Sequence, residues 1–214
     1  MIAALGGQPH QIPDHGSDDT IAGMAARALA TAPPRFCVAA HAMGGFVAFE
    51  ILRRAPERVA RLALLGTLAP SDTPAQTERR LGYARLVEAG RFDQVVEERI
   101  PILLHPERRG DAALLAKVRR MAQETGAERF LRQQRAVMSR PDSRPDLPKI
   151  RVPTLILWGR QDGIAALEHQ REMERGIAGA RLEIVEECGH LLTLERPEHV
   201  ALLLRGWFAA DGPA

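Results

Sequence analysis

Three positions of this sequence could together perform acyl-transfer chemistry if one of them carried a different residue. They are Ala42, Asp162 and His190, and they occur in that order along the chain. A carboxylate that orients a histidine, which in turn activates a serine hydroxyl, is an arrangement that attacks carbonyl carbons. The methyl group of Ala42 cannot attack anything, so the question is why an alanine stands where a serine is expected.

All three positions lie just past a segment that the apolar pattern predicts to be a strand. These strands are Phe36–Ala39, Thr154–Trp158 and Arg181–Glu186. The third alternates polar and apolar residues, as a strand with one more exposed face does. Because functional residues of open α/β sheets gather at the carboxyl ends of strands, we expect the three side chains to meet at one edge of a sheet.

The segment around Ala42 is the most specific of the three. It reads AHAMG from Ala40 to Gly44 and stands between the first strand and a helix predicted over Met43–Arg54. This context is similar to the nucleophile elbow, G-x-S-x-G, in which a serine stands exposed on a sharp strand-to-helix turn. Two residues depart from that pattern, because Ala42 replaces the serine and Ala40 replaces the first glycine.

Two further segments extend the similarity. One is Pro153–Asp162, with the sequence PTLILWGRQD, and the other is Gly189-His190 followed by Glu195-Arg196-Pro197. With the elbow, the acid and the histidine in this order, the chain resembles the α/β-hydrolases over residues 18–209, and within them the small bacterial esterases, lactonases and perhydrolases. The resemblance implies a serine carboxyl-ester hydrolase that acts on small apolar or aryl esters. A lactonase, a perhydrolase without a cofactor or a C–C bond hydrolase would share the same motif.

The resemblance also implies a role for each site residue. A serine at position 42 would be the nucleophile, His190 the general base, and Asp162 the group that fixes the imidazole. The backbone N–H of Met43 would stabilise the oxyanion. His41 and Gly44 are expected beside the site, His41 as a supporting group and not as a catalyst. Taken singly, Asp162 could instead cap a helix near Ala165, and Gly189-His190 could be a plain turn.

The fold that this resemblance implies is α/β, with a mostly parallel sheet and an inserted helical cap. Residues 1–70 and 149–214 are expected to form the core, and residues 71–148 the cap. Within the cap the spacing of apolar residues and glycines predicts four helices, over residues 73–89, 91–104, 110–125 and 127–139. A further core strand is expected over Leu62–Leu65, before the cap. Two further helices are expected after the strands Thr154–Trp158 and Arg181–Glu186, over residues 165–177 and 197–209.

The N-terminus is shorter than the family pattern requires. Ile2–Leu5 resembles the tail of a helix, and Gly6-Gly7 is either a plain turn or a substitute oxyanion-donor loop. Two alternatives fit: a minimal sheet of about five strands, or a chain that starts downstream of the usual start. An exposed sheet edge favours pairing between chains, so we expect a monomer or a homodimer.

Composition excludes several other classes of function. The chain has 214 residues and a net charge of +2, with Arg and Glu interspersed, which gives no case for nucleic acid. No apolar run approaches the ~20 residues of a membrane span, and no secretory leader is apparent, so the cytoplasm is expected. No metal-ligand spacing or cofactor motif is present. Cys37 and Cys188 are expected to be buried free thiols.

Two explanations fit the alanine at position 42. An engineered serine-to-alanine change would trap a substrate or product on an intact Asp162–His190 pair. A natural protein without catalytic activity would instead bind a small ligand. A gene freed from catalysis has no reason to keep that pair, which favours the first explanation, and a serine codon in the native gene would test it. Either way we expect this chain to bind its substrate and barely turn it over.

Overall fold

The computed structural model describes residues 9–209, in which four strands alternate with helices. In chain order the elements are α1 (Ile21–Thr31), β1 (Phe36–His41), α2 (Met43–Arg54), η2 (Pro56–Arg58), β2 (Val59–Leu65), α3 (Pro74–Glu88), α4 (Phe92–Leu103), η3 (Pro106–Arg108), α5 (Ala112–Met138), η4 (Arg144–Lys149), β3 (Thr154–Gly159), α6 (Leu167–Gly176), β4 (Arg181–Val185), α7 (Leu192–Glu195) and α8 (Pro197–Ala209). The predicted strands are therefore all present, with ends shifted by a few residues.

The strands form one parallel sheet with the order β1-β2-β3-β4. β2 and β3 consist almost entirely of apolar residues and are almost entirely buried, as strands covered on both faces are. Residues 9–209 thus contain four strands where about five were expected. Because the sheet is parallel, the carboxyl ends of all four strands lie at the same edge.

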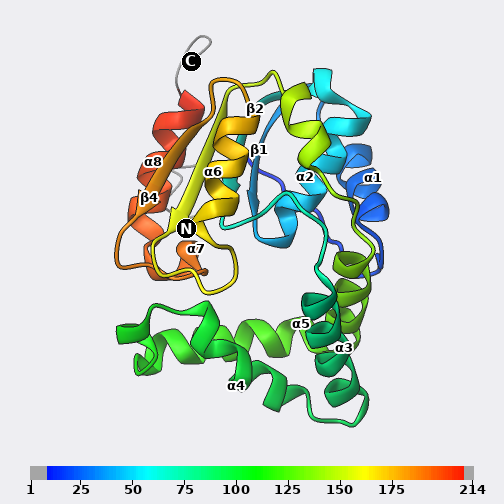
Figure 1. The fold of residues 1–214 in the computed structure, drawn as a ribbon, viewed down its shortest axis with the longest axis vertical. Helices are drawn as coiled ribbons and strands as arrows, with labels where there is room; N and C mark the ends of the chain where they lie inside the picture. Colours follow the sequence, from blue (N-terminus) through cyan, green and yellow to red (C-terminus); the bar gives the residue numbers. More distant parts are fainter. Residues whose placement is uncertain (1–8, 210–214) are drawn as a thin grey trace.

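Helices cover the two faces of the sheet unequally. On one face α2 and α6 pack against all four strands, with Phe49 and Met173 buried against Ile156. On the other face α8 packs against β2, β3 and β4, where Leu204 contributes to a buried cluster with Leu157. Figure 1 shows α6 in front of the strands, with α1 and α2 beside β1. The core therefore extends along both faces of β2 and β3.

The first strand is less well covered than its neighbours. β1 is the edge of the sheet among residues 9–209, and α8 lies over the other three strands instead. Cys37 and Ala39, which point away from α2, are exposed as a result. The expectation that both cysteines are buried is therefore wrong for Cys37, while Cys188 is fully buried.

The segment between β2 and β3 contains only helical elements, and its helices α3, α4 and α5 lie at one end of the sheet (Figure 1). The helices predicted over residues 73–89 and 91–104 correspond to α3 and α4. The two predicted over residues 110–125 and 127–139 both lie within α5, which has a kink at Gly126, where φ is 73° and ψ is 162°. These angles are not helical, so Gly126 separates two helices, as the sequence predicted.

A buried ion pair fixes both ends of this helical segment to the core. Arg140, just after α5, places Nη1 2.6 Å from Oδ1 of Asp72, just before α3, and both side chains are 2% exposed. Asp72 also accepts from Nε of Arg80, at 2.6 Å. The Arg140 guanidinium lies 4.3 Å from the ring centroid of Phe46 on α2. The two chain connections to the helical segment are therefore held side by side.

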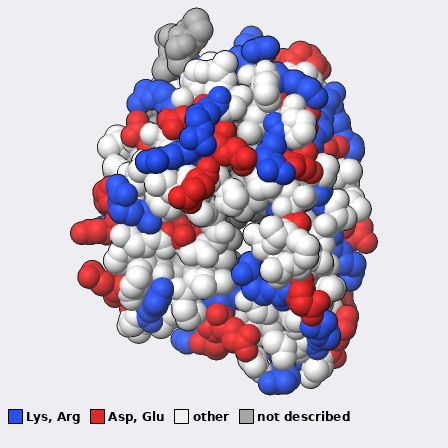
Figure 2. Space-filling view, in the orientation of Figure 1, with Lys and Arg blue, Asp and Glu red and all other residues white. Residues whose placement is uncertain are grey.

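The surface carries charges of both signs. Figure 2 shows Lys and Arg side chains interspersed with Asp and Glu over the visible face, in agreement with the near-balanced composition. Among residues 9–209 no helix is both long and apolar enough to cross a membrane.

Candidate active site

The turn after β1 holds Ala42 in a strained conformation. Its φ is 49° and its ψ is −115°, a region that residues with a Cβ rarely adopt. Three hydrogen bonds hold it there: Ala42 N–H donates to the Leu65 carbonyl (2.9 Å), and the Ala42 carbonyl accepts from Gly45 N–H (3.0 Å) and Thr67 Oγ1 (2.8 Å). The surrounding backbone therefore enforces the elbow even though its central side chain is a methyl group.

The helix that follows can approach the strand because of one glycine. A Cβ on Gly45 would overlap the side chain of Thr67, whereas a Cβ on Gly44 would only touch the Cβ of Ala40, at 3.8 Å. Close packing thus requires Gly45. Ala40 fits in place of the family's glycine, since its Cβ would stay at an ordinary contact distance even from a Cβ on Gly44. This departure from the motif leaves the turn intact.

Asp162 and His190 lie in direct contact at the ends of β3 and β4. Nδ1 of His190 is 2.9 Å from Oδ2 and 3.0 Å from Oδ1 of Asp162. The side chain of His190 is 6% exposed and that of Asp162 is 0% exposed, so solvent screens this contact little. An ionised carboxylate can only accept, so Nδ1 is the protonated nitrogen and Nε2 is left free to accept a proton.

The carboxylate of Asp162 also caps the turn that follows it. Oδ1 accepts from the backbone N–H groups of Ile164 (2.7 Å) and Ala165 (3.0 Å). Asp162 therefore contacts His190 and closes the turn at Ala165. It does not cap a helix, because α6 begins at Leu167 and its N-cap residue Ala166 has no side-chain cap. The turn fixes the carboxylate, and the carboxylate fixes the imidazole.

His41, the residue before Ala42, lies against His190 from the β1 side. Its Nε2 is 2.8 Å from the carbonyl oxygen of His190, and the two rings are 5.2 Å apart between centroids. Burial is the main reason that the pKa of His41 is lowered to about 4, and the neighbouring His190 acts in the same direction. His41 is therefore neutral near pH 7, and its Nε2–H donates to the carbonyl.

Two residues after β2 contribute to the site although the sequence did not single them out. Gly66 has a φ of 52°, and a Cβ there would lie 3.2 Å from Asp162 Oδ2 and 3.4 Å from His190 Nδ1. Thr67 donates to the Ala42 carbonyl, as described above. The available signal was a Gly-Thr pair at the end of a buried strand, in the same position as the other site residues.

A buried carboxylate connects the histidine loop to the helical segment. Glu195, 3% exposed, accepts from Gly189 N–H through Oε1 (2.9 Å) and from His105 N–H through Oε2 (2.8 Å). The Leu103 carbonyl at the end of α4 accepts in return from His190 N–H (2.9 Å). The end of α4 is thus bonded to the loop that carries His190. The sequence indicated Glu195 only as the first residue of the segment Glu195-Arg196-Pro197.

The remaining predicted site residues are placed as follows. The N–H of Met43 is the first of α2, and a helix supplies no acceptor for its first N–H groups. Gly44 is the next residue of the same turn. Burial, reinforced by Glu195, raises the pKa of Cys188 to about 12, so this thiol is protonated and unreactive. The segments Ile2–Leu5 and Gly6-Gly7 lie outside the described residues.

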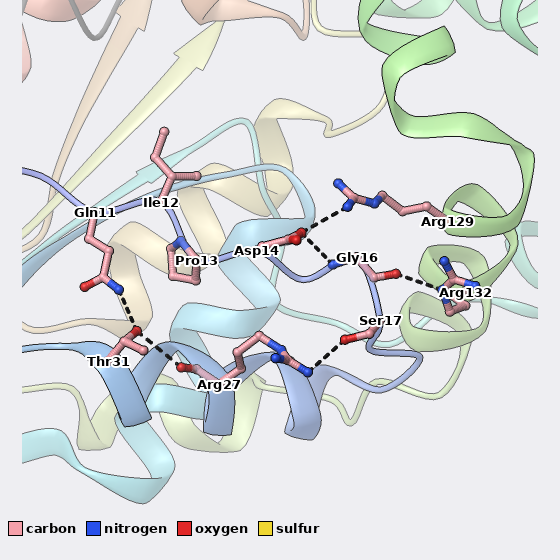
Figure 3. Close-up of a pocket in the computed structure, with 10 residues that line it drawn as sticks. All are labelled: Gln11, Ile12, Pro13, Asp14, Gly16, Ser17, Arg27, Thr31, Arg129 and Arg132. Carbon is pink, nitrogen blue, oxygen red and sulfur yellow. Dashed lines mark hydrogen bonds and ion pairs between the residues drawn. The ribbon is translucent and has the colours of Figure 1, made fainter.

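A groove of about 670 Å³ lies elsewhere, between the segment at residues 11–17, α1 and α5 (Figure 3). Its arginines are already paired: Arg129 with Asp14 (3.0 Å), Arg27 with Asp18 (2.7 Å) and Arg132 with the Gly16 carbonyl (2.8 Å). The bonds of Arg129 and Arg132 therefore hold the segment at residues 11–17 against α5. Among residues 9–209 no cluster of His, Cys, Asp or Glu could hold a metal ion.

Comparison with known proteins identifies a family that matches most of the chain. The model of the alpha/beta hydrolase family matches residues 7–201. A thermophilic esterase from Thermogutta terrifontis, solved with malate bound, is 30% identical with a TM-score of 0.82, and the match covers 94% of this chain and 75% of that one. The likeness therefore extends over nearly the whole of this chain.

Two curated relatives match over smaller parts of their length. The 2-hydroxy-6-oxononadienedioate/2-hydroxy-6-oxononatrienedioate hydrolase of Escherichia coli K12 is 28% identical over 179 residues, which are 79% of this chain and 60% of that protein. A monoacylglycerol lipase of Bos taurus is 36% identical over 72 residues, which are 34% of this chain and 21% of that protein. The chain thus spans about a fifth to three fifths of these relatives.

Proposed function

This chain belongs to the alpha/beta hydrolase family. On that premise we propose that it has the active site of a serine carboxyl-ester hydrolase, with Ala42 at the nucleophile position. One observation carries the proposal. The strained turn at Ala42 and the buried Asp162–His190 pair are both formed, although the residue at position 42 has no nucleophilic group. Strain of this kind costs about 1–3 kcal/mol and is typical of functional positions.

With a serine at position 42 the reaction would proceed in two halves. The hydroxyl oxygen attacks the ester carbonyl carbon while Nε2 of His190 takes its proton, and the carbonyl electrons form an oxyanion near the Met43 N–H. Collapse of this intermediate breaks the bond to the alcohol, which receives the proton from His190. Water then releases the acyl group by the same steps in reverse order.

The residues around this pair support the same role. Asp162 stabilises the imidazolium that forms and holds Nδ1 protonated. His41 donates to the His190 carbonyl, and Gly66, which has no Cβ, leaves the space that the Asp162 carboxylate and the imidazole occupy. The alanine removes only the nucleophile, so the chain as it stands is expected to lose a factor on the order of 10⁴–10⁶ in rate.

The substrate that we propose is a small apolar or aryl ester. A lactone or peracid reaction would use the same three positions and differ in the shape of the site. The likeness to the Thermogutta terrifontis esterase favours ester chemistry.

A second candidate, a protein that binds a small ligand without turning it over, rests on Ala42 itself. In this case an alanine would be the native residue, and restoring a serine would produce no reactive hydroxyl. The two candidates also differ in what a fluorophosphonate probe does to an Ala42→Ser variant.

Labelling by a fluorophosphonate tests the proposal directly. The activated hydroxyl would attack phosphorus, forming a P–O bond, while fluoride leaves and His190 accepts the proton. We expect Ala42→Ser to gain one adduct, found by mass spectrometry at position 42. The same variant with Asp162→Asn should label much more slowly, and the chain with Ala42 not at all. An Ala42→Ser variant that folds but stays unlabelled would favour the binding candidate.

A further inference from the structure

An arginine occupies an inward-facing position of α4 at which the helix pattern predicts an apolar residue. Phe92, Val95, Arg99 and Leu103 follow one another at spacings of three or four residues and share one face of the helix. Val95 and Leu103 are buried, and Arg99 itself is partly buried. A charged residue within such a stripe needs an explanation, since arginines are rarely buried without a partner.

Within the described residues the guanidinium of Arg99 lies over an aromatic ring and makes no hydrogen bond or ion pair. It is 5.5 Å from the ring centroid of the buried Phe130 on α5. Within residues 9–209 no hydrogen bond or ion pair involves Arg99, whereas nearby Arg80 bonds to Asp72 and Gln134. Burial lowers the pKa of Arg99, the nearby Tyr83 opposes this shift, and the positive charge of Arg80 acts in the same direction as burial. All five of its N–H donors therefore lack a protein acceptor.

These donors remain accessible to a ligand. Arg99 has no nitrogen atom that is both sealed from solvent and without a partner, so its unpaired nitrogens retain accessible surface. The guanidinium lies over the ring of Phe130, and the planar fork of its N–H groups matches the two oxygens of a carboxylate. The environment thus combines an unpaired cation with the apolar side chains of Val95, Phe92 and Phe130.

Arg99 is also close to the catalytic loop along the chain. It lies four residues, and so about 6 Å along the helix, before Leu103, whose carbonyl binds the N–H of His190. The same helix therefore carries Arg99 and, one turn later, the carbonyl that positions the histidine.

We propose that Arg99 binds a free carboxylate on the acyl part of the substrate, so that the preferred esters are half-esters of short dicarboxylic acids. The inference rests on the proposed ester hydrolase and adds the substrate class. The carboxylate would accept two N–H bonds from Arg99, and the hydrocarbon chain would pack beside Phe130. A neutral ester of the same length would leave the guanidinium unpaired.

Binding can be measured on the chain as it stands, because Ala42 prevents turnover. Calorimetry would compare phenyl hydrogen glutarate with phenyl pentanoate, which has a methyl group in place of the carboxylate. We expect the half-ester to bind about 10- to 100-fold more tightly. Arg99→Met should abolish this preference, and Arg99→Lys should keep part of it. The exposed Arg120 on α5 provides the control, since Arg120→Gln removes the same charge.

Stability separates binding from folding in these variants. Methionine fits an apolar stripe, so Arg99→Met should leave the melting temperature unchanged or raise it while binding is lost. Equal binding of the two esters, no measurable binding of the half-ester to the folded chain, or an unchanged preference in Arg99→Met would each overturn the inference.

The Ala42→Ser variant separates this inference from the proposed function. If it hydrolyses both esters equally and Arg99→Met changes neither rate, the ester hydrolase stands and the carboxylate site falls. If it hydrolyses neither ester while Arg99-dependent binding persists, the carboxylate site stands and the catalytic proposal falls.

Discussion

His41 and His190 are bonded across the ends of β1 and β4, with Nε2 of His41 2.8 Å from the carbonyl oxygen of His190. A carbonyl only accepts, so this bond requires a proton on Nε2 of His41. Because its pKa is lowered to about 4, His41 keeps the neutral form over the whole range near pH 7. The strand that presents the nucleophile position and the loop that presents the histidine are thus fixed to each other by a group that does not change charge.

This bond predicts a specific dependence of stability on pH. In the unfolded chain His41 has its ordinary pKa of 6.5, so between pH 6.5 and about 4 the unfolded state binds a proton that the folded state does not. The free energy of unfolding should be fully retained above pH 6.5 and fall below it, by about 3 kcal/mol in total at pH 4. Urea unfolding at several pH values measures this.

His41→Gln isolates the contribution of the imidazole, since glutamine keeps an N–H donor and does not titrate. The fall in stability between pH 6.5 and 4 should be smaller in this variant by about the same 3 kcal/mol. His199→Gln, on the exposed face of α8, controls for the loss of an imidazole. Equal flattening by both substitutions would contradict the assignment to His41.

The two glycines of the elbow should respond differently to the same substitution. Gly45→Ala would force Thr67 away from the Ala42 carbonyl, and we expect a loss of about 1–3 kcal/mol in the free energy of unfolding. Gly44→Ala places its methyl group at an ordinary distance from Ala40 and should be neutral or slightly stabilising. Thermal unfolding of the pair gives the comparison, and similar melting temperatures would refute the packing argument.

Glu195 should couple the end of α4 to the histidine loop. Glu195→Gln replaces one acceptor oxygen by a donor, so either Gly189 or His105 loses the acceptor for its N–H, at a cost of about 1–3 kcal/mol. Hydrogen exchange should become faster at residues 103–108 and 188–191 together. Glu186→Gln breaks only the exposed pair with Arg160 and serves as the control. Protection that is unchanged at both segments would argue against the coupling.

The two thiols should differ sharply in reactivity. Cys37 is exposed on β1, whereas Cys188 is buried and has a pKa of about 12. Iodoacetamide should therefore label the folded chain at Cys37 alone, and Cys37→Ser should remain unlabelled until it is unfolded. Peptide mass spectrometry identifies the site. Labelling of Cys188 in the native state at a comparable rate would show that its loop opens.

The sequence predicted the parts of the molecule that depend on local pattern. Apolar runs located the four strands, and the turn residues after them located Asp162 and His190. Its prediction for Cys37 was wrong because the exposure of a strand residue depends on which helix covers that face, and α8 does not extend over β1. Chain order alone does not reveal such coverage.

The residues that surround Asp162 and His190 were harder to predict than these two residues themselves. Gly66 matters because a Cβ would reach Asp162 and His190, and Glu195 because two backbone N–H groups from distant segments converge on it. Both effects arise from tertiary contacts between segments far apart in the sequence. Gly126 shows the opposite case, in which a local signal was enough, because the glycine has non-helical dihedral angles and separates two helices within α5.

The most direct test of the central claim is the rate of hydrolysis of p-nitrophenyl butyrate by this chain and by its Ala42→Ser variant. The strained turn, the Asp162–His190 pair and the Met43 N–H should make the restored hydroxyl reactive. We expect the rate to rise by about 10³-fold or more. A folded variant, with an unchanged melting temperature, that shows no gain over the parent chain would contradict the account.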